Sequence, residues 1–319
     1  MDLSIIIVNW NSKEYLEKCI ASILASTHGI SYEIVVIDGG SFDGSGEMLR
    51  KRYRQVRFIQ NEKNLGFART NNIASQVSNG RNVLFLNPDT EIEGPAIERL
   101  SHYLDVLPNA GIVGAKLLNS DGSVQTSCIQ AFPTILNQFL DSNACRAVSP
   151  GSGMWGMRPL FTGEKTPAEV DAVSGACLMI KRSLFERIGM FSSDYFMYSE
   201  DIDLCFKVRE AGRKTYYVPT AVVVHHGGVS SSRTGESAFS SVMLLESRWR
   251  FFRKTRPPWY CASYRMAMLF ASMIRIGLAM LAWPIYGLRG KAFAMGNVMK
   301  KWIAKLRWTL GGEGWVRNY

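Results

Sequence analysis

Short apolar segments alternate with helix-forming segments over the first 90 residues of the chain, and this pattern limits the fold more than any other feature. The apolar segments are Leu3–Val8, Glu33–Ile37, Arg57–Gln60 and Val83–Leu86, and helices are predicted over Lys13–Ser26, Gly46–Tyr53 and Arg69–Ser78. A strand that is apolar on both sides is buried on both faces, as in a parallel sheet covered by helices. The pattern therefore predicts an α/β fold with a mostly parallel sheet and helices on both faces.

Polar loops follow three of these strands, at Asn9–Asn11, Asp38–Asp43 and Asn87–Asp89. In open parallel sheets, ligands bind beyond the carboxyl ends of the strands, so we expect the functional site there. The carboxylate of Asp38 can accept hydrogen bonds from a nucleotide base or ribose. For a single Asp before Gly-Gly-Ser, an ordinary turn residue is the favoured interpretation.

The segment Asn87-Pro88-Asp89 presents a carboxylate from a loop that proline stiffens. Such a hard oxygen ligand beside a diphosphate suits Mg²⁺ or Mn²⁺. His225 follows a further apolar strand predicted over Ala221–Val224. Its imidazole can complete a metal site or contact phosphate. Both motifs have structural alternatives, because Asn-Pro-Asp is a common turn and a histidine at a strand end is often structural.

Three carboxylates, Glu200, Asp201 and Asp203, precede a helix predicted over Leu204–Ala211, next to the aromatic residues of Phe196–Tyr198. Carboxylates with apolar neighbours are suited to general-base catalysis. Acidic residues also stabilise the amino end of a helix by capping it and offsetting its dipole. The spacing alone leaves both interpretations open.

Several enzyme classes are excluded by missing motifs. The first strand is not followed by Gly-x-Gly-x-x-Gly, and the chain contains neither a Walker A sequence nor Gly-x-Ser-x-Gly. Nicotinamide-binding Rossmann enzymes, P-loop nucleotidases and α/β-hydrolases are therefore not expected. The six cysteines are scattered without a Cys-x-x-Cys pair, which favours reduced thiols and a cytosolic setting.

The positive charge is concentrated in the last quarter of the chain. Residues 245–319 carry 14 Lys and Arg against 2 Asp and Glu, a net charge of +12, whereas residues 1–244 carry 23 against 25, a net charge of −2. A basic segment can bind nucleic acid or an anionic membrane. The high apolar content here favours the membrane, and no nucleic-acid partner is expected.

Two apolar stretches lie within this basic region. Met266–Leu288 is long enough to cross a bilayer, but Arg275 near its centre costs about 2.5–3.5 kcal/mol on insertion scales. Lys291–Trp308 has apolar residues at helical spacing and a basic remainder, typical of a helix in the membrane interface. We predict that residues 236–319 form a basic helical tail on an anionic membrane surface. The alternatives are a re-entrant or spanning segment, and a basic helix packed on its own domain.

Taken together, the motifs resemble those of inverting glycosyltransferases of family 2, which have the GT-A fold, near the rhamnosyltransferase-like branch. The resemblance covers about 230 residues. It is carried, in order, by Ser4–Asn11, Val35–Ser45, Asn64–Ala68, Phe85–Thr90, Val173–Arg182, Ser199–Asp203 and Val224–His226.

The resemblance implies a donor site. Asp38 is expected to contact the donor base, with Asn9 and Trp10 near the nucleotide. Asn87 and Asp89 occupy the place of the family's Asp-x-Asp motif, so Asp89 is expected to bind Mg²⁺ or Mn²⁺ and the donor diphosphate. Asn87 replaces the first Asp of that motif and removes one anionic ligand.

The resemblance also implies a metal ligand and an acceptor side. His225 is expected to be a further ligand of the metal or phosphate. Asp201 is expected to deprotonate the acceptor hydroxyl, while Glu200 and Asp203 support the acceptor and the helix. Ser174 and Gly175 are expected to shape the part of the site that holds the sugar and the acceptor.

The implied protein has a GT-A domain over residues 1–235, with a nucleotide-sugar half at 1–115 and an acceptor half at 116–235. It transfers a sugar from a nucleotide-diphosphate donor, with dTDP-rhamnose first and a UDP-sugar second, to a lipid-linked saccharide or polysaccharide. We expect peripheral attachment at the cytoplasmic face of the inner or plasma membrane. The alternatives are a nucleotidyltransferase, whose basic glycine-rich loop is missing, and a non-catalytic scaffold, which predicts loss of Asp89 or Asp201.

Overall fold

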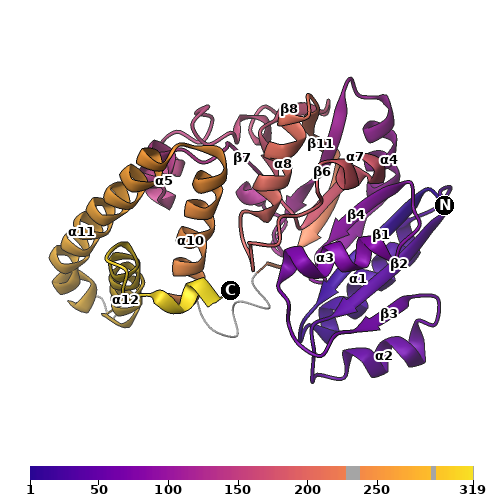
Figure 1. Cartoon of the computed structure of the whole chain (residues 1–319), viewed down its shortest axis with the longest axis horizontal. Coiled ribbons are helices and arrows are strands. Elements are labelled where there is room, and N and C mark those ends of the chain that lie inside the picture. Colours follow the sequence, from indigo (N-terminus) through magenta and orange to yellow (C-terminus); the bar gives the residue numbers. More distant parts are fainter. Residues whose placement is uncertain (228–237, 289–291, 319) are drawn as a thin grey trace. The chain divides into compact units, whose positions relative to one another are not determined.

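The computed structural model describes residues 1–227, 238–288 and 292–318, and Figure 1 shows their helices and strands. Contacts divide the chain into two compact units. The first consists of Met1–Phe132, Ser149–Phe196 and the described part of Glu200–Ser230, and the second of Pro133–Val148, Met197–Ser199 and the described part of Ser231–Tyr319. The predicted domain boundary at residue 235 lies outside the described residues and stays a prediction.

The first unit is built on a nine-stranded sheet in the order β3-β2-β1-β4-β10-β6-β11-β5, in which β8 also pairs with β11. Six strands run in one direction, and β5, β8 and β10 run in the other. The bounds are β1 Leu3–Asn9, β2 Tyr32–Asp38, β3 Arg57–Gln60, β4 Asn82–Leu86, β5 Thr90–Glu93, β6 Ala110–Leu118, β8 Ala168–Val170, β10 Cys177–Lys181 and β11 Lys214–His225. A small separate sheet joins β7 (Ile129–Gln130) to β9 (Ala172–Val173).

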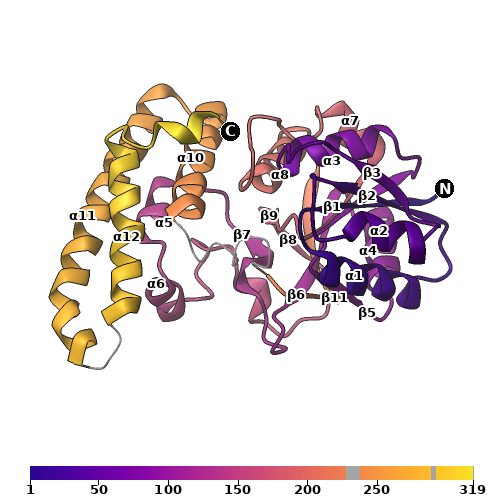
Figure 2. The same cartoon turned by 90° about the horizontal axis from the view of Figure 1, so that it is seen from below.

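Helices cover both faces of this sheet, so the predicted fold class is confirmed. Figure 2 shows α3, α7 and α8 on one side of the sheet and α1 and α4 on the other. The bounds are α1 Lys13–Ser26, α2 Ser45–Arg52, α3 Phe67–Gln76, α4 Ala96–Val106, α7 Arg182–Arg187 and α8 Glu200–Glu210. Short 3-10 turns lie at η1 (Thr126–Cys128) and η2 (Arg158–Leu160).

The sequence forms these elements because burial matches their periodicity. The apolar side chains of β1 include four that are fully buried, Leu3, Ile5, Ile6 and Ile7, as a strand covered on both faces requires. The buried side chains of α1 are Leu16, Cys19, Ile20 and Ile23, which follow the spacing of one helix face. The predicted α1 and β3 have the observed bounds, whereas α3 begins two residues earlier than predicted.

Strands β5, β6 and β10 were not part of the predicted alternation. β10 lies antiparallel between β4 and β6, so its partners come from distant parts of the chain. β6 contains Gly114, where a Cβ atom would approach the Val173 side chain to 2.5 Å. Glycine is required at this close approach, and it weakens the local strand signal.

The second unit is helical among its described residues. Its elements are α5 Ile135–Leu140, α6 Asn143–Val148, α10 Ala238–Thr255, α11 Pro258–Leu288, α12 Ala292–Thr309 and the 3-10 turn η3 Gly314–Asn318. The predicted apolar stretch Met266–Leu288 lies within α11. The predicted amphipathic helix corresponds to α12, and its first residue, Lys291, lies outside the described residues.

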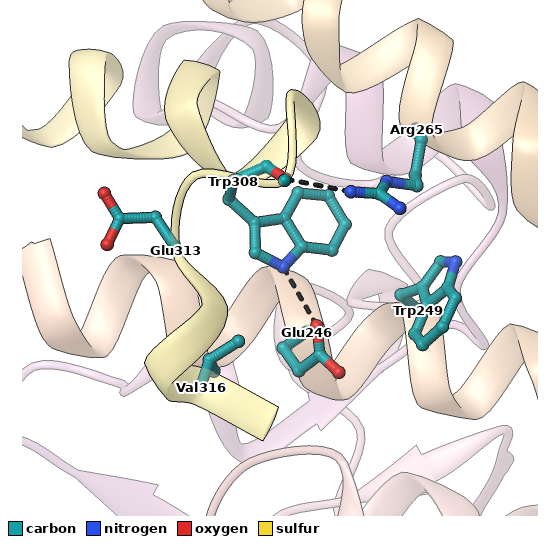
Figure 3. A pocket seen from close by; sticks show the side chains of 7 residues that line it. Glu246, Trp249, Arg265, Trp308, Glu313 and Val316 are labelled. Atoms are coloured by element: carbon teal, nitrogen blue, oxygen red, sulfur yellow. Dashed lines mark hydrogen bonds between the residues drawn. The ribbon is translucent and has the colours of Figure 1, made fainter. Parts of the chain in front are cut away.

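A buried carboxylate joins the helices of the second unit. Figure 3 shows the indole of Trp308 pointing toward Glu246 of α10, and its Nε1 donates to Glu246 Oε2 at 2.9 Å. The other oxygen of Glu246 accepts a hydrogen bond from Arg250 Nε at 3.2 Å. Arg250 also donates to the carbonyl of Val316 at 3.2 Å. These bonds fix α12 and η3 against α10.

Candidate active site

The three predicted loops do meet at the carboxyl edge of the sheet. Asn9 ends β1 and is paired in register with Asp38, which ends β2. Asn87 follows β4, the other neighbour of β1. The parallel pairing of these strands brings the loops together, as the general rule for open sheets predicts.

Asp38 is fully buried, and its carboxylate shapes the loop that follows it. Oδ2 accepts from Asn9 Nδ2 at 2.6 Å. Oδ1 accepts from the backbone of Gly40 and Ser41 and from Gln60 Nε2, at 3.0, 2.6 and 2.7 Å. In this structure Asp38 therefore orders the predicted base-binding loop, while the neighbouring Trp10 is 40% exposed at the same edge.

Asp43 joins two helix amino ends in this loop. Its Oδ2 accepts from the Lys13 backbone at the start of α1, and its Oδ1 accepts from the Ser45 backbone at the start of α2, at 2.8 and 3.0 Å. Burial by itself raises the pKa of Asp43, but the hydrogen bonds from Ser45 and Lys13 outweigh burial and hold the pKa below its ordinary value. The carboxylate replaces the capping side chain that both helices lack.

Asp89 and His225 lie side by side, although 136 positions separate them in the chain. The antiparallel pairing of β5 with β11 places His225 opposite Thr90, next to Asp89. His225 Nε2 is 3.3 Å from Asp89 Oδ1 and 3.2 Å from Asn87 Nδ2. Both side chains are largely buried, at 13% and 9% exposed. The predicted metal ligands are therefore close enough to share one ion.

The hydrogen bonds of His225 determine which ring nitrogen carries the proton. Its Nδ1 lies 2.7 Å from Gln125 Oε1, and Gln125 Nε2 donates to Asn119 Oδ1 at 3.0 Å. Gln125 therefore presents its oxygen to the imidazole, so Nδ1 carries the proton. Nε2 is then unprotonated, and its single lone pair accepts from Asn87 Nδ2 in this structure. A metal ion held by Asp89, 3.3 Å away, would take the same lone pair.

Gln125 is a residue that the sequence analysis missed. It follows a turn at Asn119–Ser123, in which the Ser123 backbone and hydroxyl donate to Asp121 Oδ1. A single glutamine after an Asp-Gly turn carries no distinctive sequence pattern. Only the pairing of β6 with β11 brings this turn beside His225.

The turn Ser174–Ala176 connects the Asn87 loop to Asp201. The carbonyl of Ala176 accepts from the Asn87 backbone at 3.0 Å, and the Gly175 backbone donates to Asp201 Oδ2 at 3.0 Å. Ser174 Oγ accepts from the Ala176 backbone at 3.2 Å and stabilises the turn itself. The other oxygen of Asp201 accepts from the Ile202 backbone at 2.8 Å. One short turn therefore contacts both the Asn87 loop and Asp201 at the amino end of α8.

The two neighbouring carboxylates are buried. Asp203 is 3% exposed and accepts hydrogen bonds from Ser192 Oγ at 2.6 Å and the Tyr195 hydroxyl at 3.2 Å. Burial, together with the charge of Asp203, raises the pKa of Tyr195, so this hydroxyl stays protonated and donates. Asp203 therefore connects α8 to the segment before it, and its predicted role in supporting the acceptor and the helix stays a prediction. Glu200 is 8% exposed at the first position of α8.

Backbone strain is concentrated just before α8. Tyr198 and Ser199 have φ angles of 69° and 64°, in the left-handed region that non-glycine residues rarely adopt. Upstream, the carbonyl of Phe196 accepts from the Phe67 backbone at 2.9 Å. A Cβ atom on Gly66 would lie 2.4 Å from that carbonyl oxygen. Strained residues of this kind often accompany functional sites.

Residues 4–189, more than half of the chain, match the family model for glycosyl transferase family 2. The chain belongs to this family. The match includes the Asn9, Asp38 and Asn87–Asp89 loops and the turn at Ser174–Ala176, and the family membership inferred from the motifs is confirmed.

Sequence relatives match most of the chain. An N-acetylglucosaminyl-diphospho-decaprenol L-rhamnosyltransferase of Mycobacterium tuberculosis is 28% identical over 284 residues, which cover 83% of this chain and 89% of the relative. Rhamnosyltransferase WbbL of Escherichia coli is 26% identical and covers 79% of this chain and 93% of the relative. A low-salt glycan biosynthesis hexosyltransferase, Agl10 of Haloferax volcanii, is 29% identical, and the match covers 78% of this chain and 74% of the relative.

Solved structures support the fold. A mannosyltransferase of Pyrobaculum calidifontis in complex with GDP-mannose and Mn²⁺ is 18% identical, has a TM-score of 0.57, and covers 98% of this chain and 87% of its own. The structure of Staphylococcus aureus TarS residues 1–349 is 16% identical and has a TM-score of 0.51. The match covers 98% of this chain and 92% of the TarS chain. At these identities the likeness concerns the fold alone.

Proposed function

We propose that this chain is an inverting glycosyltransferase that transfers a hexose, with L-rhamnose as the first candidate, from a nucleotide-diphosphate donor to a lipid-linked saccharide or polysaccharide acceptor. Family membership supports sugar transfer, and two relatives matched over most of their length are named rhamnosyltransferases. The observation that carries the proposal is the turn Ser174–Ala176, which holds Asp201 and the Asn87–Asp89 loop in one constellation. A UDP-sugar is the second candidate donor.

The proposed general base is Asp201. Each of its oxygens accepts one backbone hydrogen bond, which leaves a further lone pair on each oxygen. Asp201 accepts the proton of the acceptor hydroxyl while the hydroxyl oxygen forms a bond to the anomeric carbon. The bond from that carbon to the diphosphate oxygen breaks, and its electron pair leaves with the nucleoside diphosphate. This single displacement inverts the anomeric centre and requires no carboxylate nucleophile.

Asp89 and His225 fit a divalent metal. One carboxylate oxygen and one imidazole nitrogen with a directed lone pair converge, and Gln125 fixes the ring. In the part of the chain that the structure describes, no cluster of three or more His, Cys, Asp and Glu side chains forms a closed metal cage. An open site of this kind leaves positions for phosphate oxygens and suits Mg²⁺ or Mn²⁺. When bound, the ion offsets the charge on the departing diphosphate.

The remaining predicted residues have proposed roles around the donor and acceptor. Asn9 and Asp38 order the loop on which the nucleotide rests, and the exposed ring of Trp10 offers a surface for the base. Gly175 donates its backbone N–H to Asp201. A Cβ atom added at Gly175 would lie 3.4 Å from the Cβ atom of Asp201. Glu200 is proposed to support the acceptor side.

We also propose peripheral attachment at the cytoplasmic face of the inner or plasma membrane. Among the described residues one helix, Pro258–Tyr286, is long and apolar enough to cross a membrane by length and composition. The net charge of +12 over residues 245–319 supports contact with anionic lipid. The six free cysteines, five of them buried, fit a reducing compartment.

Donor calorimetry tests the proposal. dTDP-rhamnose, UDP-sugars and GDP-mannose are titrated with and without Mn²⁺ into the wild type, Asp89→Ala and the surface control Asp105→Asn. We expect Mn²⁺-dependent binding of one donor that only Asp89→Ala removes. Asp201→Asn is expected to bind that donor normally but to lower the transfer rate about 10²–10⁴-fold, the usual contribution of a general base. Mn²⁺-independent binding, or normal turnover by Asp201→Asn, would contradict these roles.

A further inference from the structure

The two arginines of α11 point into the second unit and away from its outer surface. Arg265 donates to the carbonyl of Trp308 at 3.0 Å, and its guanidinium lies 5.3 Å from the centre of the Trp308 ring. Arg275 lies 4.6 Å from the Trp302 ring and donates to the carbonyl of Asp141 at 3.1 Å. Figure 3 shows Arg265 directed at the Trp308 backbone. Arg275, whose charge argued against membrane insertion, is therefore half-buried and in contact with groups of the second unit.

The opposite face of α11 forms an uncharged apolar stripe. Its members are spaced three or four positions apart and are between 50% and 77% exposed, namely Met266, Phe270, Ile274, Leu278, Leu281 and Ile285. The helix is 31 residues long, about 46 Å at 1.5 Å per residue. Continuous exposed apolar surfaces of this kind mark sites of protein or membrane contact.

Helix α12 runs antiparallel along α11 and packs against it, so the two helices enter or avoid the membrane together. At one end of the hairpin Arg265 meets Trp308, and toward the other end a Cβ atom on Gly296 would lie 3.8 Å from the Trp283 ring. The two helices lie side by side in Figure 2. Part of the apolar face of α12 is buried within the unit, including Met295 and Trp308. The apolar surface left for lipid therefore comes chiefly from α11.

This pairing determines the orientation in a membrane. If α11 crossed the bilayer, α12 would enter it too and carry Lys300, Lys301, Lys305 and Arg307 into the hydrocarbon, which strongly opposes insertion. A helix with one apolar face and basic residues nearby is instead stable parallel to the membrane plane. A second copy of the chain is a poor occupant of the stripe, because each copy brings a net charge of +12 over residues 245–319.

We propose that α11 lies in the plane of an anionic bilayer, with the Met266–Ile285 stripe in the outer part of the hydrocarbon and the basic residues of α12 at the level of the lipid headgroups. This inference rests on the membrane attachment in the proposed function and specifies the surface and its orientation. It makes α11, and not the basic helix alone, the part of the chain that enters the membrane. A lipid-linked acceptor would then reach an enzyme already held at the membrane surface.

A depth profile tests this orientation without any turnover. Each residue of the stripe is replaced in turn by a spin-labelled cysteine in a Cys145→Ser background, and the full chain is bound to vesicles containing phosphatidylglycerol. Accessibility to oxygen and to a water-soluble nickel chelate then gives the depth of each label. We expect similar depths for all six positions, whereas a label at the control position Lys254→Cys, an exposed residue at the carboxyl end of α10, stays in water.

Two other profiles would overturn the proposal. A maximum of depth between positions 274 and 278, with water exposure at positions 266 and 285, would show that α11 spans the bilayer. Spin–spin broadening without oxygen access would show that a second copy covers the stripe. As an independent check, Phe270→Glu with Leu278→Glu is expected to weaken vesicle binding at least tenfold while donor binding by calorimetry stays unchanged. Absence of donor binding in the wild type as well would instead contradict the proposed function.

Discussion

Replacing Gln125 by leucine tests how the metal ligand is oriented. Leucine has a similar size but accepts no hydrogen bond, so the 2.7 Å contact to His225 Nδ1 is lost. The largely buried Nδ1–H is then left without its partner, which costs about 1–3 kcal/mol and favours a rotated ring or the other tautomer. Either change turns the Nε2 lone pair away from Asp89.

The expected effect is a loss of metal affinity. Removing a partner that orients a metal-binding histidine typically lowers affinity 10–100-fold, or about 1.4–2.7 kcal/mol. Gln125→Glu is the matched control, because a carboxylate still accepts from Nδ1 and is expected to keep affinity at or above the wild-type value. Mn²⁺ binding is measured from the paramagnetic resonance signal of free Mn²⁺, with thermal unfolding as a check on the fold.

Two results would refute this reasoning. If Gln125→Leu binds Mn²⁺ as tightly as Gln125→Glu, the hydrogen bond does not orient the ligand. If His225→Ala also binds normally, the histidine is not a ligand at all, and its bond to Gln125 is structural. A loss in His225→Ala alone would keep His225 in the site but remove Gln125 from it.

The remaining predictions concern stability. Gly66→Ala is expected to lower the free energy of unfolding by about 3 kcal/mol or more, because its φ is +81° and its Cβ would lie 2.4 Å from the Phe196 carbonyl oxygen. Gly163→Ala, with φ +70° and open space around it, is the control and is expected to cost about 1 kcal/mol in urea unfolding. Burial raises the pKa of the thiols of Cys19, Cys177 and Cys205 from 9.0 to about 12 in the folded protein. In the unfolded chain these thiols lose their protons above a pKa near 9. The stability that the buried, protonated thiols contribute is therefore complete below pH 9 and is lost as the pH rises toward 12. Above pH 9 we expect a loss of up to about 1.4 kcal/mol per pH unit for each thiol, reduced by one such slope in Cys19→Ala; an unchanged slope would show that Cys19 is not buried.

The sequence was informative where structure is local. Apolar strands and helix periodicity predicted the strands β1 to β4 and helices α1 to α3 within two residues, because burial on both faces leaves a direct pattern in the chain. The rule that ligands bind at carboxyl ends then placed the Asn9, Asp38 and Asn87 loops at one edge. Their chemical roles, and that of Asp201, stay predictions that the geometry supports.

Other features depended on contacts between distant segments. Only the pairing of β5 and β6 with β11 shows that Gln125 orients His225, and only packing shows that Asp38 and Asp203 are buried within their own hydrogen-bond networks. Likewise, Arg275 counts against insertion in a linear hydropathy profile, yet the fold turns it toward Trp302. The sequence by itself determined the elements and the edge of the sheet where the site lies, because periodic burial is a local property. The tertiary structure decided the long-range partners of the polar side chains, such as Gln125, 100 positions from His225, and Asp89, 136 positions from His225, because contacts between distant segments leave no local pattern.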